Sequence, residues 1–233
     1  MTSAIEDSAA AGPRAALTTA DLARWCALAQ TATAANRQHL DEINLLFDPD
    51  EDTGTNLTEM WSSLHVATEL VVRKSPGLVT PAALLVLWGE DNDYDIVGRS
   101  TRIMKRVFRA MASAAHGAPV LTSSRFSDVL AAAANISIRD WDELLPEAGD
   151  QPGGPQPGTI LDVVEAAADA ANSARRAGLD AQLLRVAAAA KRATEATSRH
   201  HQILRATGLV DAGALGLAVA LQELPEVLRG ARQ

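Results

Sequence analysis

Apolar residues recur along the chain at the three- and four-residue spacing of amphipathic helices, and turn signals divide them into segments. A cap at Thr18 and Thr19 precedes a helix that runs toward Ile43, and a second helix begins at Thr55 or Asn56 and ends at residues 76–77. The same signals predict further helices over residues 81–88, 100–115, 124–134, 138–145, 159–177, 181–205 and 212–224. We therefore expect an all-α bundle or barrel of about eight or nine helices.

A single domain accounts for this pattern, because 233 residues is close to the upper limit for one hydrophobic core. We expect a flexible N-terminal segment over residues 1–17 and a helical domain over residues 18–230. Residues 149–158 contain three prolines, which exclude a helix there. Since the helices on both sides have apolar faces that need partners, this stretch is predicted to be a Pro/Gly-rich surface loop within the domain.

Composition and charge exclude several classes of protein. An aromatic content of 3% argues against an all-β fold, and a net charge of −8 provides no basic field for general nucleic-acid binding. The single cysteine, Cys26, cannot form an internal disulfide and is interpreted as a small buried hydrophobe. No segment has the pattern of a signal peptide or a membrane span, so we expect a cytoplasmic protein without a membrane partner.

Familiar nucleotide and zinc motifs are missing from the sequence. None of the three lysines belongs to a Gly-Lys-Ser/Thr phosphate loop, and no two of the five histidines lie one helical turn apart. A basic stripe is predicted on one helix and is either a solvated face or a docking surface for an acidic partner or phosphorylated substrate; it comprises Arg102, Lys105, Arg106 and Arg109. The tryptophans are expected in the core or at an interface, and these are Trp25, Trp61, Trp88 and Trp141.

Four carboxylates crowd into residues 48–52: Asp48, Asp50, Glu51 and Asp52. Like charges at about 4 Å repel by about 1 kcal/mol in water and about 4 kcal/mol near a protein surface, so these side chains either spread into solvent or surround divalent cations. Residues 53–56 bring backbone amides and hydroxyls just before a helix N-terminus, an arrangement that binds phosphate. Carboxylates beside such amides are typical of a magnesium–nucleotide site.

Two other interpretations of the acidic segment stay open. One is a solvated acidic turn whose last residues cap the next helix, where negative charge is favourable. The other is a calcium loop, because Asp48, Asp50, Asp52 and Glu59 have EF-hand spacing. Against calcium, the glycine that should make the sharp turn comes one residue late, at Gly54.

Asn44 and residues 50–56, Asp-Glu-Asp-Thr-Gly-Thr-Asn, resemble the Asp-Gly-Asp-Thr/His-Gly-Thr-Asn loop of the DhaL domain family. Residues 98–104, 158–161 and 209–217 resemble three further motifs of that family, in the same order. The family includes the nucleotide-binding subunit of dihydroxyacetone kinase and the N-terminal domain of the fatty acid kinase ATP-binding subunit. The resemblance implies a single-domain barrel of about eight antiparallel helices that holds Mg-ADP or Mg-ATP at one end.

The resemblance also assigns roles to individual residues. It places a pair of Mg²⁺ ions on Asn44, Asp50 and Asp52. It implies phosphate contacts from Thr53, Gly54, Thr55, Asn56, Gly98 and Ser100, and contacts to the rest of the ATP or ADP from Thr159, Asp211 and Gly213. No protein nucleophile is needed in such a site, because metal ions and hydrogen-bond donors stabilise the transferred phosphoryl group.

A dihydroxyacetone (glycerone) kinase-like subunit is the function that the resemblance implies. The acceptor would be dihydroxyacetone on a substrate-binding partner subunit or, as an alternative, an acyl group on a fatty-acid carrier protein. The chain departs from the family pattern at Glu51, Arg99, Thr101 and Ala214. These departures favour a second hypothesis, a nucleotide-sensing or partner-binding module without turnover. The third, a structural bundle, predicts that Asp50 and Asp52 can be changed without consequence.

Overall fold

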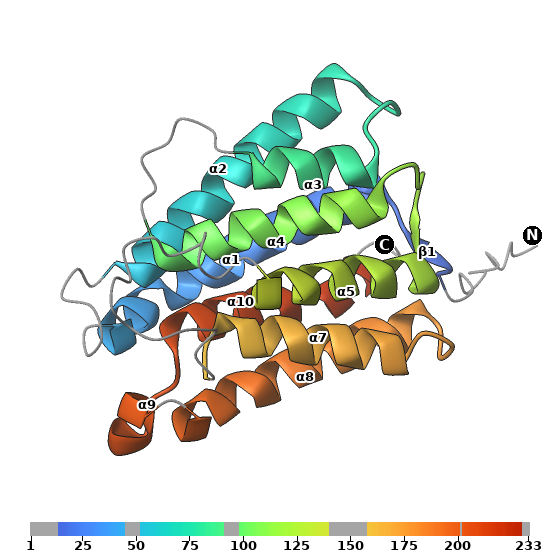
Figure 1. The fold of residues 1–233 in the computed structure, drawn as a ribbon. Helices are drawn as coiled ribbons and strands as arrows, with labels where there is room; N and C mark the ends of the chain where they lie inside the picture. Colours follow the sequence, from blue (N-terminus) through green and yellow to red (C-terminus); the bar gives the residue numbers. More distant parts are fainter. Residues whose placement is uncertain (1–13, 45–51, 91–97, 140–157, 201, 230–233) are drawn as a thin grey trace, which may run out of the picture.

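The computed structural model describes residues 14–44, 52–90, 98–139, 158–200 and 202–229, which form an all-α fold as the sequence predicts (Figure 1). The first half contains β1 (Ala16–Leu17), α1 (Thr19–Asn44), α2 (Thr53–Lys74), α3 (Pro81–Gly89) and α4 (Arg99–Ala115). The second half contains β2 (Leu121–Thr122), α5 (Ser123–Arg139), α7 (Ile160–Ser173), α8 (Leu179–His200), α9 (Gln202–Thr207), α10 (Ala212–Gln222) and α11 (Leu224–Arg229).

The long helices surround a common core and alternate in direction. Helix α1 packs against α2 and α10, α4 against α3 and α5, and α7 against α5 and α8, while α8 contacts α10. As a result of this alternation, the N-termini of α2, α4, α7 and α10 all lie at the same end of the molecule (Figure 1). The C-termini of α1 and α8 lie at that end as well.

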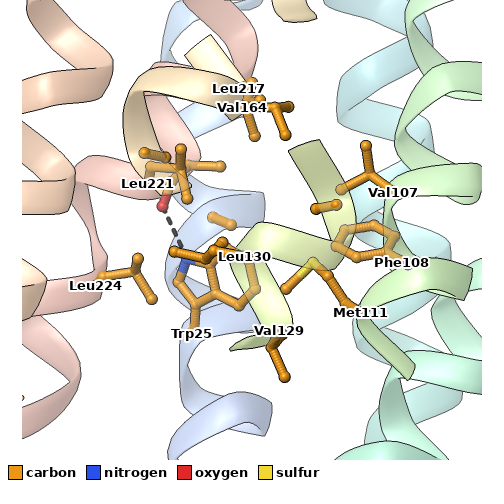
Figure 2. Close-up of a cluster of buried hydrophobic side chains, with 14 of the residues drawn as sticks. Trp25, Val107, Phe108, Met111, Val129, Leu130, Val164, Leu217, Leu221 and Leu224 are labelled. Carbon is orange, nitrogen blue, oxygen red and sulfur yellow. Dashed lines mark hydrogen bonds between the residues drawn. The ribbon is translucent and has the colours of Figure 1, made fainter. Parts of the chain in front are cut away.

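Side chains from most of the helices meet in the core, and Figure 2 shows part of this cluster, with residues from α1, α4, α5, α7, α10 and α11. Trp25 of α1 is 3% exposed and donates a hydrogen bond from Nε1 to the carbonyl oxygen of Ala220 in α10, at 2.8 Å. The indole therefore buries its apolar surface without leaving its N–H unpaired. This bond fixes α1 against α10 across the core.

A second feature of the core is a group of aromatic rings in edge-to-face contact. Trp61 lies with its ring centroid 5.6 Å from that of Trp25 and 5.8 Å from that of Phe108, while Trp88 lies 5.4 Å from Phe108. Trp88 also donates from Nε1 to the hydroxyl of Thr68 at 2.8 Å. The prediction that these tryptophans belong to the core is confirmed, and Trp141 lies outside the described residues.

Several helix boundaries differ from the sequence prediction. Helix α2 begins at Thr53, α7 ends at Ser173, and the segment predicted as one helix over residues 181–205 contains α8 and α9. Helix α5 continues to Arg139, where the sequence predicts an end at Ala134 and a new helix from Ile138, because no glycine or proline interrupts residues 135–137. Residues 140–145 of that predicted helix lie outside the described residues. Pro225 indicates a helix end in the sequence, but it occupies the first turn of α11, where its missing N–H costs nothing.

A two-stranded ladder joins the starts of α1 and α5. Ala16 and Leu17, assigned from the sequence to the N-terminal segment, pair antiparallel with Thr122 and Leu121, and Leu17 is 1% exposed. Strands of two residues are too short to produce an alternating pattern, so the sequence does not reveal them. Residues 1–13 and most of the predicted loop at 149–158 lie outside the described residues.

Candidate functional site

Helix α2 begins directly after Asp52, which occupies the N-cap position. An N-cap aspartate ordinarily accepts a hydrogen bond through its side chain from an amide in the first turn. Here the Asp52 side chain accepts no such bond, while its carbonyl oxygen accepts from the amide of Asn56 at 2.7 Å. The carboxylate of Asp52 is therefore not committed to the cap of its own helix.

The capping bond comes instead from Asp41 of α1. The Thr55 amide donates to Oδ1 of Asp41 at 3.0 Å, and the Thr55 hydroxyl donates to Oδ2 at 2.9 Å. Arg37 Nε donates to the same hydroxyl at 3.1 Å. Both donors of Thr55 are thus bound by Asp41, and within the described residues the amides of Thr53 and Gly54 have no acceptor.

Gly54 lets the first turn of α2 lie directly on α1. A Cβ atom at this position would be 2.1 Å from the carbonyl oxygen of Arg37 and 2.8 Å from Cβ of Leu40. No side chain fits in that space, because the nearest obstacle is backbone. The close approach brings the Asp41 carboxylate within reach of the Thr55 amide.

The start of α4 lies against the start of α2. Gly98 is the N-cap residue of α4, and a Cβ atom there would be 2.9 Å from Nδ2 of Asn56. In the first turn that follows, Thr101 is fully buried, and its hydroxyl has no hydrogen-bond partner within the described residues. The α4 N-terminus is therefore a tightly packed neighbour of residues 53–56.

The start of α10 closes on α4 from the other side. A Cβ atom at Gly213 would be 2.5 Å from Oγ of Ser100 and 3.3 Å from Oδ1 of Asp211. Asp211 caps α10 by accepting from the Ala214 amide at 2.7 Å, and its own amide donates to the hydroxyl of Thr197 in α8 at 3.0 Å. Backbone and side chains of three helices thus meet at this point.

Asp211 has an unusual acid–base character. Burial raises the pKa of its carboxyl from 3.8 to about 6, and the negative charge of Asp162 adds to this effect. Hydrogen bonds from the amides of Ala214 and Gly213 and the positive charge of Arg99 act in the opposite direction. The pKa places Asp211 near the boundary between its neutral and ionised forms in mildly acidic solution.

Helix α7 brings a fourth N-terminus to the same region. Gly158 precedes it with φ at +87°, and its amide donates to Oδ2 of Asp162 at 2.8 Å. Thr159 is the N-cap residue, and its hydroxyl accepts from the Leu161 amide. The same Asp162 oxygen lies 3.5 Å from Nδ1 of His200, at the end of α8. Asp162 therefore connects the α7 start to α8 and, through its charge, to Asp211.

The four N-termini give this end of the barrel its electrostatic character. Each helix presents the positive end of its dipole at its first turn, which favours an anion. Phosphate groups bind well to such positions. The arrangement suits a polyphosphate ligand lying between α2, α4 and α10.

The structure brings together several residues that the sequence predicts for one site. Asn56 lies beside Gly98, and Ser100 lies beside Gly213 and Asp211. Thr159 stands at the α7 start, three residues before Asp162. Asn44 is the last residue of α1, and Asp52 precedes α2.

The metal-ligand set stays a prediction. Asp48, Asp50 and Glu51 lie outside the described residues. Among those described, no group of three His, Cys, Asp or Glu residues is arranged to hold a metal ion. The calcium and solvated-turn interpretations of residues 48–52 are likewise untested.

Sequence reasoning missed two residues that organise this site, Asp41 and Asp162. Asp41 lies three residues before Asn44 on a helix, so both belong to one helix face, and this spacing was the available signal. Asp162 follows the Thr159 cap by three residues, the spacing at which an acidic side chain can reach back to the helix start. Both carboxylates accept hydrogen bonds from backbone amides of the loops or turns that begin the helices.

Arg109 belongs to the predicted basic stripe on α4 and contacts the end of α3. Arg109 donates from Nε to the carbonyl oxygen of Gly89, and a Cβ atom at residue 89 would lie 2.6 Å from Cγ of Arg109. This arginine therefore holds the end of α3 against α4. Docking of an acidic partner on the stripe stays a prediction.

The fold is a helical barrel in which four helix N-termini lie at one end (Figure 1). The family model described as the DAK2 domain matches residues 49–226. The chain therefore belongs to the DAK2 domain family, which confirms the DhaL-type resemblance seen in the sequence.

Among solved structures, the chain is similar to the dihydroxyacetone kinase from C. freundii, crystallised in complex with AMP-PNP and Mg²⁺. The two are 20% identical with a TM-score of 0.61, and the match covers 97% of this chain and 37% of that kinase chain. At this identity the likeness establishes the fold, which is the all-α DhaL type. No curated protein matches the chain. Within the described residues, no helix combines the length and apolar character needed to cross a bilayer.

Proposed function

We propose that this protein is the magnesium–nucleotide-binding subunit of a kinase and supports phosphoryl transfer to dihydroxyacetone held on a separate substrate-binding subunit. The observation that carries the proposal is the meeting of the α2, α4 and α10 N-termini around Asn56, Gly98, Ser100 and Gly213. The glycines at these turns let the helix starts pack closely together, and helix N-termini favour phosphate.

Each part of the site has a role in this proposal. The amides of Thr53 and Gly54 and the hydroxyl of Ser100 bind the phosphates, since these donors begin α2 and α4. Asn44 and Asp52 provide oxygen ligands for magnesium together with Asp50, which lies outside the described residues. Magnesium, when bound, neutralises charge on the β- and γ-phosphates. Membership of the DAK2 family and the ligands of the C. freundii structure support this reading.

The proposal assigns the acceptor to a separate substrate-binding subunit, because phosphoryl transfer requires an acceptor hydroxyl held close to the γ-phosphate. The chain spans 37% of the C. freundii kinase chain that it resembles. In our proposal the described residues bind and orient the nucleotide, and the partner presents the acceptor hydroxyl. Transfer then depends on positioning and charge stabilisation rather than on a covalent intermediate on this chain.

A transfer assay tests the proposal. The purified protein is mixed with Mg²⁺, γ-labelled ATP, dihydroxyacetone and a dihydroxyacetone-binding kinase subunit, and labelled dihydroxyacetone phosphate is measured. We expect product only when both proteins are present, and a decrease of about 100-fold for Asp52→Ala. The Glu59→Gln variant is a matched control, because Glu59 is an exposed carboxylate further along α2. Product that forms equally well without this protein would contradict the proposal. If the phosphoryl group is transferred only to an acyl group on a fatty-acid carrier protein, that acyl group, and not dihydroxyacetone, is the acceptor.

A nucleotide-sensing module without turnover is the second candidate. It is favoured by Thr101, which is fully buried in the first turn of α4 with its hydroxyl unpartnered among the described residues, and by Arg99, whose charge acts on Asp211. Both residues differ from the DhaL pattern at the turn that would face phosphate. Magnesium-dependent nucleotide binding with no labelled product from either acceptor would establish this candidate.

A further inference from the structure

Asp41 takes the helix-capping role that the position of Asp52 predicts for Asp52. Thr55 is the third residue of α2, so its amide is the one that the N-cap residue Asp52 would ordinarily bind. That amide binds Asp41 of α1 instead, at 3.0 Å, and the Thr55 hydroxyl donates to the second oxygen of Asp41. A carboxylate from another helix therefore takes the bond that would otherwise occupy Asp52.

We propose that Asp41 is a positioning residue, which caps α2 in place of Asp52 and so keeps the Asp52 carboxylate available to the magnesium of a bound nucleotide. This inference rests on the proposed function and adds a residue that does not itself contact the ligand. Asp41 acts through Thr55 and Asp52, and it is needed because a carboxylate engaged in a helix cap has fewer lone pairs to offer a metal ion.

Arg37 holds this arrangement in place. Its Nε donates to the Thr55 hydroxyl at 3.1 Å and lies 3.9 Å from Oδ2 of Asp41. The guanidinium offsets the charge of Asp41. Gly54 is the other requirement, because only a residue without a side chain lets α2 approach Asp41 this closely.

Removal of Asp41 has a specific consequence. In Asp41→Ala the Thr55 amide loses its acceptor, and Asp52 at the N-cap is the nearest replacement along the chain. Asp52 then caps the helix, which preserves much of the stability but withdraws the carboxylate from the metal site. A purely structural Asp41 would give the opposite result, a loss of stability with unchanged metal dependence.

The first arm of the test uses thermal unfolding without nucleotide. We expect Asp41→Ala and Asp52→Ala each to change Tm by less than about 1 °C, because either carboxylate can cap α2, and the double variant to lose about 3 °C. Glu42→Gln is the matched control, since Glu42 is exposed, adjacent to Asp41 and accepts a hydrogen bond from Gln38 within α1. If the Tm change of the double variant equals the sum of the two single changes, Asp41 and Asp52 do not substitute for one another as the cap of α2, which would contradict the inference.

The second arm measures ADP affinity with and without magnesium. We expect the magnesium enhancement, the ratio of the two Kd values, to decrease at least tenfold in Asp41→Ala and to stay unchanged in Glu42→Gln. Asp41→Asn should restore part of it, because its amide oxygen can still accept from Thr55. Enhancement that persists in Asp41→Ala, while Asp52→Ala abolishes it, would overturn the inference and leave the proposed function intact. If the wild-type protein itself shows no magnesium enhancement, both fail.

Discussion

Gly213 of α10 and Ser100 of α4 lie so close together that a Cβ atom on residue 213 would be 2.5 Å from the Ser100 hydroxyl oxygen. Two residues far apart in the sequence thereby join two helix N-termini. A Cβ atom on Gly98 at the start of α4 would be 2.9 Å from Nδ2 of Asn56 in α2, so α4 contacts both of the other helix starts.

The first prediction follows from that contact. Gly213→Ala should lower the free energy of unfolding by about 1–3 kcal/mol and weaken nucleotide binding, because the new methyl group displaces Ser100. Adding Ser100→Ala removes the obstructing oxygen and should restore part of the stability without restoring affinity. Urea denaturation and ADP titration of both variants provide the measurement. A stable Gly213→Ala protein with normal affinity would show that the two starts are not in contact.

The second prediction concerns Gly54. Gly→Ala in a helix interior ordinarily stabilises a protein by about 0.5–1 kcal/mol. At residue 54 we expect a loss of about 2 kcal/mol or more, because the Cβ atom would lie 2.1 Å from the Arg37 carbonyl oxygen. Urea denaturation measures the change in the free energy of unfolding. A Gly54→Ala variant more stable than the wild type would contradict the close packing of α2 on α1.

The third prediction is a pH dependence due to Asp211. Because the folded protein raises the pKa of this carboxyl from 3.8 to about 6, its proton is held more tightly than in the unfolded chain. The stabilisation is complete below about pH 4 and is lost as the pH rises through about 6, by about 3 kcal/mol in total. Asp211→Asn keeps an acceptor for the Ala214 amide but cannot titrate.

A comparison of the wild-type protein with Asp211→Asn isolates the effect of Asp211 titration on stability. The stability of the wild type relative to Asp211→Asn should decrease between pH 4 and pH 6 and level off above that range. Denaturant unfolding at several pH values measures the difference. A difference that is constant, or that increases with pH, would show that Asp211 has an ordinary or lowered pKa.

The fourth prediction is that Cys26 is chemically inert in the folded protein. Its side chain is fully buried, and burial raises the pKa of the thiol to about 12, so almost no thiolate forms at neutral pH. Iodoacetamide should label the protein only after denaturation, as mass spectrometry would detect. Rapid labelling under native conditions would mean that α1 separates from α2 and α3 more easily than the packing of Trp25 and Trp61 implies.

The sequence predicts the fold well, because each of its signals is local. Apolar spacing and the cap signal at Thr18 and Thr19 are properties of a few neighbouring residues, and α1 begins where this signal predicts. The helix boundaries that the sequence predicts wrongly also result from the use of local signals alone. Pro225 can either stop one helix or start the next, and nothing in the local sequence separates these outcomes.

The site is predicted less completely, because parts of it depend on contacts between distant helices. Motif resemblance brings Asn56, Gly98, Ser100 and Gly213 to one place, and their packing agrees. It does not reveal that Asp41 of α1 binds the Thr55 amide, since that contact requires α1 and α2 to be packed together first. The burial that raises the pKa of Asp211 is likewise a property of the folded barrel.

The most direct test of the central claim is a calorimetric titration of the wild-type protein and Asp52→Ala with ADP, in the presence of Mg²⁺ and again in excess EDTA. We expect saturable binding by the wild type that weakens at least tenfold when magnesium is removed, and binding by Asp52→Ala that is weak and indifferent to magnesium. Equal affinity for the two proteins under both conditions would show that this end of the barrel is not a magnesium–nucleotide site.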